Sequence, residues 1–307
     1  MDLKAPQRSG TAGVRTLVLM PVVAVLGILG AVGPIPPDSG PTPPILVEDT
    51  LSSLSSLPSL ARDIRVSAVL DSYGTLIDSV AYLDDDVLFV AAEGSVYFQQ
   101  GRMLGEEHLN QWEGFDPLFY AYSLRPLREP PPLTKTPTYS TDFLESLFGR
   151  TETRIRSHGV SAEFLDHKVF VNAFCLDALQ QVEREIRAIA GRDPDVQEWV
   201  REIDVAYSFI DKEIRGSLSR SHHAFGLAID LVPASYEGKQ VYWRWSRVFN
   251  RTSWHRIPIS ERWSPPQAVV AAFERNGFVW GGKWSHFDTI HFEYRPEILA
   301  FNRMRGN

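Results

Sequence analysis

An uncharged N-terminal segment is the feature that most limits what this chain can fold into. Thr16 to Ile35 contains no charged residue, and its length matches the ~20 residues that a helix needs to cross a bilayer. Lys4, Arg8 and Arg15 precede it, so the positive-inside bias places the N-terminus in the cytoplasm. We expect residues 1–35 to be a cytoplasmic tip and a transmembrane anchor, with the remaining chain across the membrane.

A cleavable signal peptide is the closest alternative for this segment. The small-residue tract Gly30–Gly33 resembles a cleavage region, but Pro34 follows at once. The apolar run also exceeds the roughly 7 to 15 residues usual in signal peptides. A buried core helix is disfavoured, because long uncharged N-terminal segments are seldom core elements. The anchor is therefore favoured, and both an anchor and a signal peptide would export the remaining chain.

Residues 36–61 are typical of a tether. Prolines crowd residues 34–44, and LSSLSSLPSL follows from residue 51. Such a composition favours a semi-extended spacer over helix or sheet. We therefore predict a Pro/Ser-rich tether over 36–61 and one folded extracytoplasmic domain over 62–307.

The patterns within 62–307 predict an α+β domain with flanking helices around a small, mainly antiparallel sheet. VLFVAAEGSVYF (87–98) is typical of two strands joined at Glu93-Gly94, whereas GRMLGEEHLNQW (101–112) opens with helix-like residues. A helix is predicted from Ser264, followed by Pro265, to Asn276-Gly277. Strands are expected over Phe278–Trp280 and Thr289–Tyr294.

An amphipathic helix is predicted around Cys175, the chain's single cysteine. Apolar residues recur there at helical spacing, so Cys175 is expected in the core rather than as a nucleophile: Cys175, Leu179, Val182, Ile186 and Ile189. One cysteine excludes disulfides and multi-cysteine metal sites, so a metal site would need His and carboxylate ligands. The formal net charge of −7, and −9 beyond residue 35, argues against nonspecific nucleic-acid binding.

The first chemical motif is SRSHHAFGLAIDLVP, residues 219–233. A strand starting near Gly226 would place Ala228 and Asp230 on one face and apolar residues on the other. Gly226 permits a bend that brings His223 over the space beside Asp230. The adjacent His222 is an alternative ligand, but its spacing to Asp230 is less suitable. This pattern is half of a metal site.

The second motif is WGGKWSHFDTIHFEYRP, residues 280–296. His291 and Glu293 would share a strand face, and Asp288 would stand at the strand entrance, within reach of a water on the same ion. Two His and one carboxylate leave a fourth zinc position open, as in catalytic zinc sites. Glu293 is expected either to orient a ligand or to pair with Arg295.

Other candidates are less specific. His286 is expected to be exposed or to support the site, and His108, His158, His167 and His255 show no ligand spacing. An aromatic groove for substrate and a role in the core are both open for four tryptophans: Trp243, Trp245, Trp280 and Trp284.

The two motifs together resemble the zinc D-alanyl-D-alanine carboxypeptidases, which include vancomycin-resistance-type D,D-peptidases and phage L-alanyl-D-glutamate endopeptidases. The matching positions are Ser221, His223, Gly226, Ala228 and Asp230, then Asp288, His291, Phe292 and Glu293, with Gly281-Gly282 and Trp284 in addition. The close match covers about residues 217–296. The resemblance implies one Zn²⁺ held by His223, Asp230 and His291, with Asp288 as catalytic base.

The same resemblance implies an upstream arginine that binds the oxyanion or the substrate's carboxylate. The closest position holds Lys212, with Arg215 and Arg220 nearby. Lysine is a poorer bidentate partner of carboxylates, so this departure weakens the case for strict carboxypeptidase action. Ser221 and Trp284 are further candidates for contact with substrate.

The sequence therefore predicts a zinc metallopeptidase at the bacterial inner membrane, with its catalytic domain in the periplasm. Its expected substrate is a peptidoglycan stem peptide, cut by a D-alanyl-D-alanine carboxypeptidase activity. Alternatives are an L-alanyl-D-glutamate or other cell-wall endopeptidase, or an inactive zinc-containing domain that binds the cell wall. The presence of Asp288 favours an enzyme.

Overall fold

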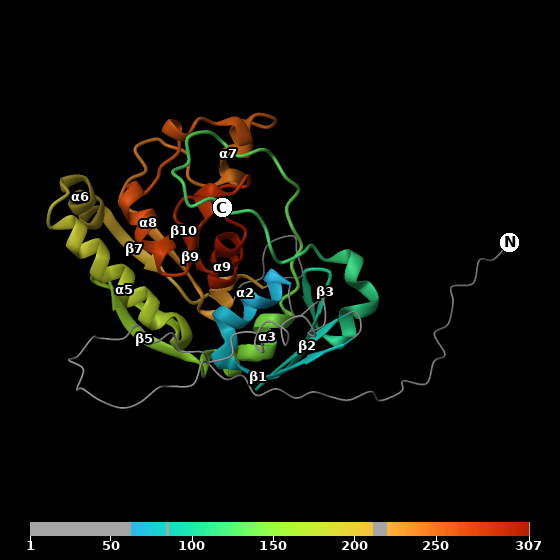
Figure 1. The fold of residues 1–307 in the computed structure, drawn as a ribbon. Helices are drawn as coiled ribbons and strands as arrows, with labels where there is room; N and C mark the ends of the chain where they lie inside the picture. The colour runs from blue at the N-terminus through green and yellow to red at the C-terminus, as the bar shows by residue number, and fades with distance from the viewer. Residues whose placement is uncertain (1–62, 84–85, 211–219, 307) are drawn as a thin grey trace, which may run out of the picture.

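Two separate antiparallel sheets form the framework of the protein (Figure 1). The computed structural model describes residues 63–83, 86–210 and 220–306. The first sheet has the order β1-β2-β3-β4, with strands Ile77–Tyr82, Val87–Ala91, Gly94–Gln99 and Arg102–Leu104. The second has the order β7-β8-β10-β9, with strands Ile203–Tyr207, Ala228–Pro233, His291–Tyr294 and Phe278–Trp280. A hairpin of β5 and β6 stands apart from both sheets, with strands Gly159–Phe164 and His167–Asn172.

Helices surround these sheets. The α-helices are α2 (Ile64–Tyr73), α3 (Asp142–Phe148), α4 (Glu152–Arg156), α5 (Ala173–Ala190), α6 (Pro194–Glu202), α7 (Trp243–Phe249), α8 (Gln267–Arg275) and α9 (Pro296–Met304). Short 3₁₀ segments are η2 (Gly74–Leu76), η3 (Glu106–Gly114), η4 (His222–Phe225), η5 (Trp254–Arg256), η6 (Ile259–Glu261) and η7 (Gly281–Lys283). Helix α2 packs against α9, so the first and last described helices lie together.

One face of the second sheet belongs to the main hydrophobic core. Ile229 and Leu231 of β8 and Phe292 of β10 are buried in it. The Phe292 ring stacks on Phe273 of α8 with centroids 3.9 Å apart. Because side chains alternate along a strand, Asp230, His291 and Glu293 point to the opposite face. The core therefore fixes which side of the sheet carries the polar residues.

The segment before α3 is tied to the edge of the second sheet through Tyr122. Its buried hydroxyl donates to Glu274 Oε1 at 2.6 Å and accepts from the backbone N–H of Trp280 at 2.8 Å. Lys283 Nζ lies 2.5 Å from the same Glu274 oxygen. This network satisfies a donor at the edge strand β9 and links residues far apart in sequence.

Several fold predictions are confirmed. Every strand ladder in the described residues is antiparallel. Strands β2 and β3 form the predicted hairpin, and α5 buries Cys175 on its apolar stripe. Burial also raises the pKa of the Cys175 thiol to about 12, as a core thiol requires.

Three predictions need correction. The antiparallel strands form two four-stranded sheets rather than one small sheet. Residues Arg102–Leu104 are not helical, because they pair with β3 as strand β4. Helix α8 begins at Gln267 instead of after Ser264. Each residue before a proline is biased away from helical geometry, so Pro265 and Pro266 delay the start.

The predicted anchor at Thr16–Ile35 lies outside the described residues, as does the tether over 36–61. Within the described ranges, no helix has the length and apolar character needed to cross a bilayer.

Gly226 should be essential to the fold, because it has a left-handed φ of +67° and an added Cβ would lie 2.7 Å from the backbone nitrogen of Asn172. We expect Gly226→Ala to lower the free energy of unfolding by about 3 kcal/mol. Gly238 is a matched control, since its φ is +75° but no atom lies within 4 Å of an added Cβ. Gly238→Ala should cost only about 1 kcal/mol. Urea unfolding of the full chain measures both, and equal losses would contradict the role of close packing at Gly226.

Candidate metal centre

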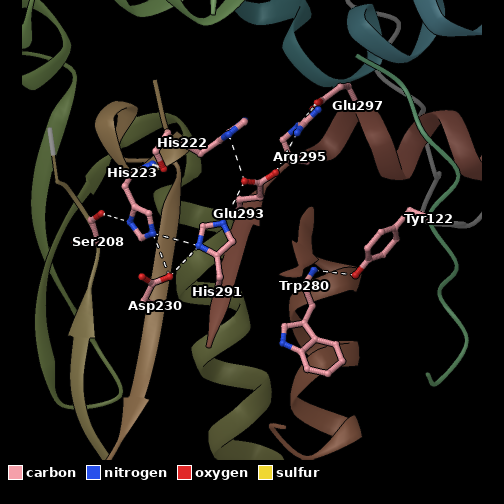
Figure 2. A network of polar contacts seen from close by, with 11 residues as sticks. Tyr122, Ser208, His222, His223, Asp230, Trp280, His291, Glu293, Arg295 and Glu297 are labelled. Atoms are coloured by element: carbon pink, nitrogen blue, oxygen red, sulfur yellow. Dashed lines mark hydrogen bonds and ion pairs between the residues drawn. The ribbon is translucent and has the colours of Figure 1, made fainter. Parts of the chain in front are cut away.

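Three side chains converge at one point on the polar face of the second sheet (Figure 2). Asp230 Oδ1 lies 2.8 Å from His291 Nδ1 and 3.1 Å from His223 Nε2. The two imidazole nitrogens are 3.2 Å apart. The structure thus brings together the three residues that the motifs predict as zinc ligands.

The local backbone accounts for this convergence. Asp230 and His291 are directly paired across β8 and β10, and opposed cross-strand residues point to the same side of a sheet. His223 comes from η4, whose first turn is capped by the Ser221 side chain, which accepts from the His223 backbone N–H at 3.3 Å. Gly226 closes η4 in left-handed geometry and turns the chain into β8. Ser221 therefore positions a ligand.

The donor set fits a cation. His223 Nδ1 donates to the backbone carbonyl of Ser208 at 2.5 Å, and His291 Nε2 donates to Glu293 Oε2 at 3.2 Å. With a cation bound, each ring would keep its proton on the far nitrogen and turn the lone pair of the near nitrogen toward the point that it shares with Asp230. Two imidazole lone pairs and a carboxylate oxygen then meet at one point. Zn²⁺ accepts this combination of ligands.

The electrostatics of the three groups agree with this chemistry. Burial acts to raise the pKa of Asp230, but hydrogen bonds to His223 and His291 outweigh it and hold that pKa well below its usual value. Burial acts to lower the pKa of His291, but its bonds to Asp230 and Glu293 raise it well above its usual value. The carboxylates of this site therefore stabilise a positive charge beside them. The Asp230 side chain is 22% exposed, so solvent reaches the centre.

A buried chain of charges supports His291 from behind (Figure 2). Glu293 accepts from His291 on one oxygen and from Arg295 Nη1, at 3.0 Å, on the other. Arg295 Nε also donates to Glu297 Oε1 at 2.5 Å, and Tyr73 of α2 donates to the second Glu297 oxygen at 3.0 Å. Glu293 thus orients the ligand and also pairs with Arg295. Such support commonly strengthens metal binding by fixing the ring and its tautomer.

His222 points away from the three ligands. Its Nδ1 lies 3.3 Å from Glu293 Oε2, and burial lowers its pKa to about 4. The position beside Asp230 and His291 belongs to His223, as its spacing to Asp230 predicted.

Asp288 stands at the entrance to β10, close enough to the ligands for their charges to affect its pKa. Its backbone is fixed by a bond to the Gly281 carbonyl at 3.1 Å and by a bridge to Tyr242. Among the described residues, no group hydrogen-bonds to its buried Oδ1. Burial raises the pKa of this carboxyl to about 7. A carboxyl with this pKa and one unpartnered oxygen is suited to accept a proton near neutral pH.

The two glycines of the second motif allow this approach. A Cβ at Gly281 would lie 2.6 Å from the Asp288 carbonyl, and one at Gly282 would lie 2.2 Å from the Trp280 ring. Trp280 is a core residue, whereas the half-buried Trp284 ring lies 5.5 Å from the His291 ring. Trp284 therefore stands beside the centre.

Of the three predicted cations, Lys212 and Arg215 lie outside the described residues. Arg220 is described, and its Nη1 donates to the carbonyl of Arg150 at 2.6 Å. This bond turns its guanidinium toward the segment before α4.

Two other histidines behave differently from their sequence interpretation. His286 is half-buried and packs on Trp243 and Trp254, with centroids 4.6 and 5.1 Å away. His108 bonds to Asp142 at 2.7 Å, and with Glu107 these residues could hold an ion. Spacing missed this group because Asp142 is far along the chain. Its two carboxylates already have other partners, namely the Gly105 backbone N–H and Arg150.

The sequence also missed the residues that support the ligands. Ser208 acts through its backbone carbonyl, which leaves no trace in residue type. Tyr73 and Glu297 belong to the first and last described helices, and no local pattern links them. Glu293, Arg295 and Glu297 alternate along the chain, but only Glu293 lies in β10, so a strand pattern could not have linked the three.

Metal analysis of the purified full chain should find one zinc per chain. Asp230→Ala or His223→Ala should abolish tight binding, because each removes one of three ligands. Glu293→Gln should keep the stoichiometry but weaken affinity by about 10- to 100-fold, because it weakens the bond that orients His291.

His167→Ala serves as the control, since His167 lies on β6, outside the metal-ligating groups. Competition with a chromogenic chelator measures the affinities. Unchanged zinc binding in Asp230→Ala would refute the assigned ligand set.

Comparison with known families supports this centre. Residues 215–294 match the model of a family described as D-alanyl-D-alanine carboxypeptidase. The matched segment contains all three converging ligands and Asp288. No solved structure gives a significant match to the chain. The family resemblance of the two motifs is confirmed over residues 215–294, and this match supports a zinc metallopeptidase hydrolase similar to the D-alanyl-D-alanine carboxypeptidases.

Proposed function

We propose that this protein is a membrane-anchored zinc peptidase that removes the terminal D-alanine from peptidoglycan stem peptides. The observation that carries the proposal is the unpartnered Asp288 Oδ1 beside the three converging ligands. A purely structural zinc site would not need a buried carboxylate with an empty hydrogen-bonding position. The family match independently points to a peptidoglycan-related hydrolase.

His223, Asp230 and His291 would hold the ion. When bound there, zinc would lower the pKa of a water molecule toward ~7 and polarise the scissile carbonyl. Asp288 would serve as the base, accepting on its Oδ1 a proton from the water that attacks the carbonyl carbon. The same carboxyl then gives the proton to the leaving amine as the peptide bond breaks. Both transfers use one oxygen, which fits the free Oδ1.

The residues that support the metal ligands act by holding those ligands in place, and they do not contact the substrate. Ser208 and Glu293 hold the two histidine rings so that their lone pairs stay on the ion. Burial acts to raise the pKa of Glu293, but its contacts with His222, His291 and Arg295 outweigh it and hold that pKa well below its usual value, so Glu293 stays ionised. Trp284, beside His291, would form one wall against the substrate.

Cleavage of D-alanine-terminated stem peptides by the full chain should depend on Asp288. Asp288→Asn should lower the rate by about 10²- to 10⁴-fold while zinc stays bound, because only the proton acceptor is lost. Mass spectrometry of the muropeptide products measures both the rate and the bond that is cut. Glu261→Gln, an exposed carboxylate on η6, is the control.

Loss of one alanine mass supports carboxypeptidase action, whereas larger fragments would indicate an endopeptidase of the same family. Intact substrate with the zinc-loaded protein would instead favour a binding domain without activity.

The anchor is part of the proposal, because it would place the catalytic domain in the compartment that holds peptidoglycan. Its support is the uncharged run from Thr16 to Ile35 and the basic residues before it. Full-length protein should stay with bacterial membranes after alkaline carbonate washing, whereas Leu26→Arg with Leu29→Arg should release it, since two central charges oppose insertion. Release of the unaltered chain in soluble form would indicate a cleaved signal peptide.

A further inference from the structure

The outer face of α7 is an exposed apolar surface. Trp245, Val248 and Phe249 are 56%, 68% and 84% exposed. Their spacing of three and four residues puts them on one side of the helix. The inner side is already packed, because Ser246 is buried and Trp243 lies against Trp254. The outer side chains therefore do not complete the hydrophobic core.

This surface is also basic, in a chain that is acidic overall. Between Glu237 and Glu261 the sequence has five Lys or Arg residues and no Asp or Glu. Arg247, Arg251 and Arg256 are exposed, and no ion pair holds any of them in the described part of the chain. We define the α7 face as Trp245, Val248 and Phe249, with Arg247 and Arg251 as the exposed arginines that adjoin it in the chain.

We propose that the α7 face docks the folded domain on an anionic lipid surface. Projecting aromatic and aliphatic side chains with adjacent arginines are the composition of helices that lie in a membrane interface. The apolar residues would enter the boundary between headgroups and acyl chains, and the arginines would meet the lipid phosphates. Charge complementarity thus identifies the partner.

Two other occupants fit less well. A second copy of this chain, in the usual two-fold arrangement, would bring two basic faces together, and their like charges repel. A small cell-wall ligand would need a concave site with several polar groups. Phe249 and Val248 instead project into solvent and offer no hydrogen bonds. The lipid surface needs neither a cavity nor an acidic partner.

Docking through the α7 face would also affect where Asp288 lies, because α7 contacts the segment that carries this residue. Trp243 at the start of α7 donates its backbone N–H to the Phe287 carbonyl at 2.9 Å, and Tyr242 bridges to Asp288. Docking through α7 would therefore hold the catalytic carboxylate near the membrane surface. The α7 face belongs to the folded domain, so the proposal depends neither on the N-terminal anchor nor on peptidase activity.

A fluorescent reporter at residue 249 tests this contact in the full chain. Phe249→Cys can be labelled selectively with the polarity-sensitive dye NBD, because Cys175 is 1% exposed and its thiol has a raised pKa of about 12. The labelled chain is reconstituted into vesicles of phosphatidylcholine alone or mixed equally with phosphatidylglycerol. We expect a blue shift and brighter emission only in the mixed vesicles. Arg247→Glu with Arg251→Glu should abolish the response.

Leu83 provides the matched control. It is also an exposed apolar residue, and it directly follows β1, a strand of the first sheet. NBD at Leu83→Cys should not respond to lipid composition. Equal emission from residue 249 in both kinds of vesicle would overturn the proposal. A shift that follows protein concentration would indicate a second copy, and one seen only with soluble muropeptides would indicate a wall ligand. Each outcome also rejects lipid docking.

Discussion

The cross-strand pair of Asp230 and His291 is the interaction on which the site and the fold both depend. The register that sets these two ligands side by side also sends Ile229 and Phe292 into the core. A slip of one residue would reverse both faces at once. Burial of the apolar face therefore enforces the geometry of the polar one, and the metal centre needs little structure of its own beyond the turn that carries His223.

The part of the chain before the two motifs contributes to the candidate site by holding its ligands in place rather than by supplying a ligand. Tyr73 of α2 ends a buried chain that runs through Glu297, Arg295 and Glu293 to His291. Burying charges is costly unless each has partners, and here the carboxylates alternate with the arginine and the tyrosine. The packing of α2 on α9 completes this network. The first described helix thus helps to orient a ligand on a distant strand.

The sequence was sufficient to predict those features that depend on residues only a few positions apart. The ligand motifs, the stripe of α5 and the β2–β3 hairpin each show a period within a few residues. It could not predict contacts that tertiary structure alone creates, such as the Ser208 carbonyl on His223 or the bond from Tyr122 to β9. Strand β4 was missed because three residues are too few to show alternation. The start of α8 was misplaced because the constraint of consecutive prolines outweighed a capping pattern.

Tertiary contacts also connect the candidate site to the exposed helix α7. Asp288 owes its position to Tyr242 on one side and to Gly281 on the other, so the segment that presents Trp245 and Phe249 also holds Asp288 in place. Trp243 and Phe287 pack in one small aromatic cluster beneath α7. Trp243 also donates its backbone N–H to the Phe287 carbonyl, so α7 is bonded to the residue directly before Asp288. On the proposed docking, the orientation of the domain and the position of Asp288 would depend on the same set of contacts.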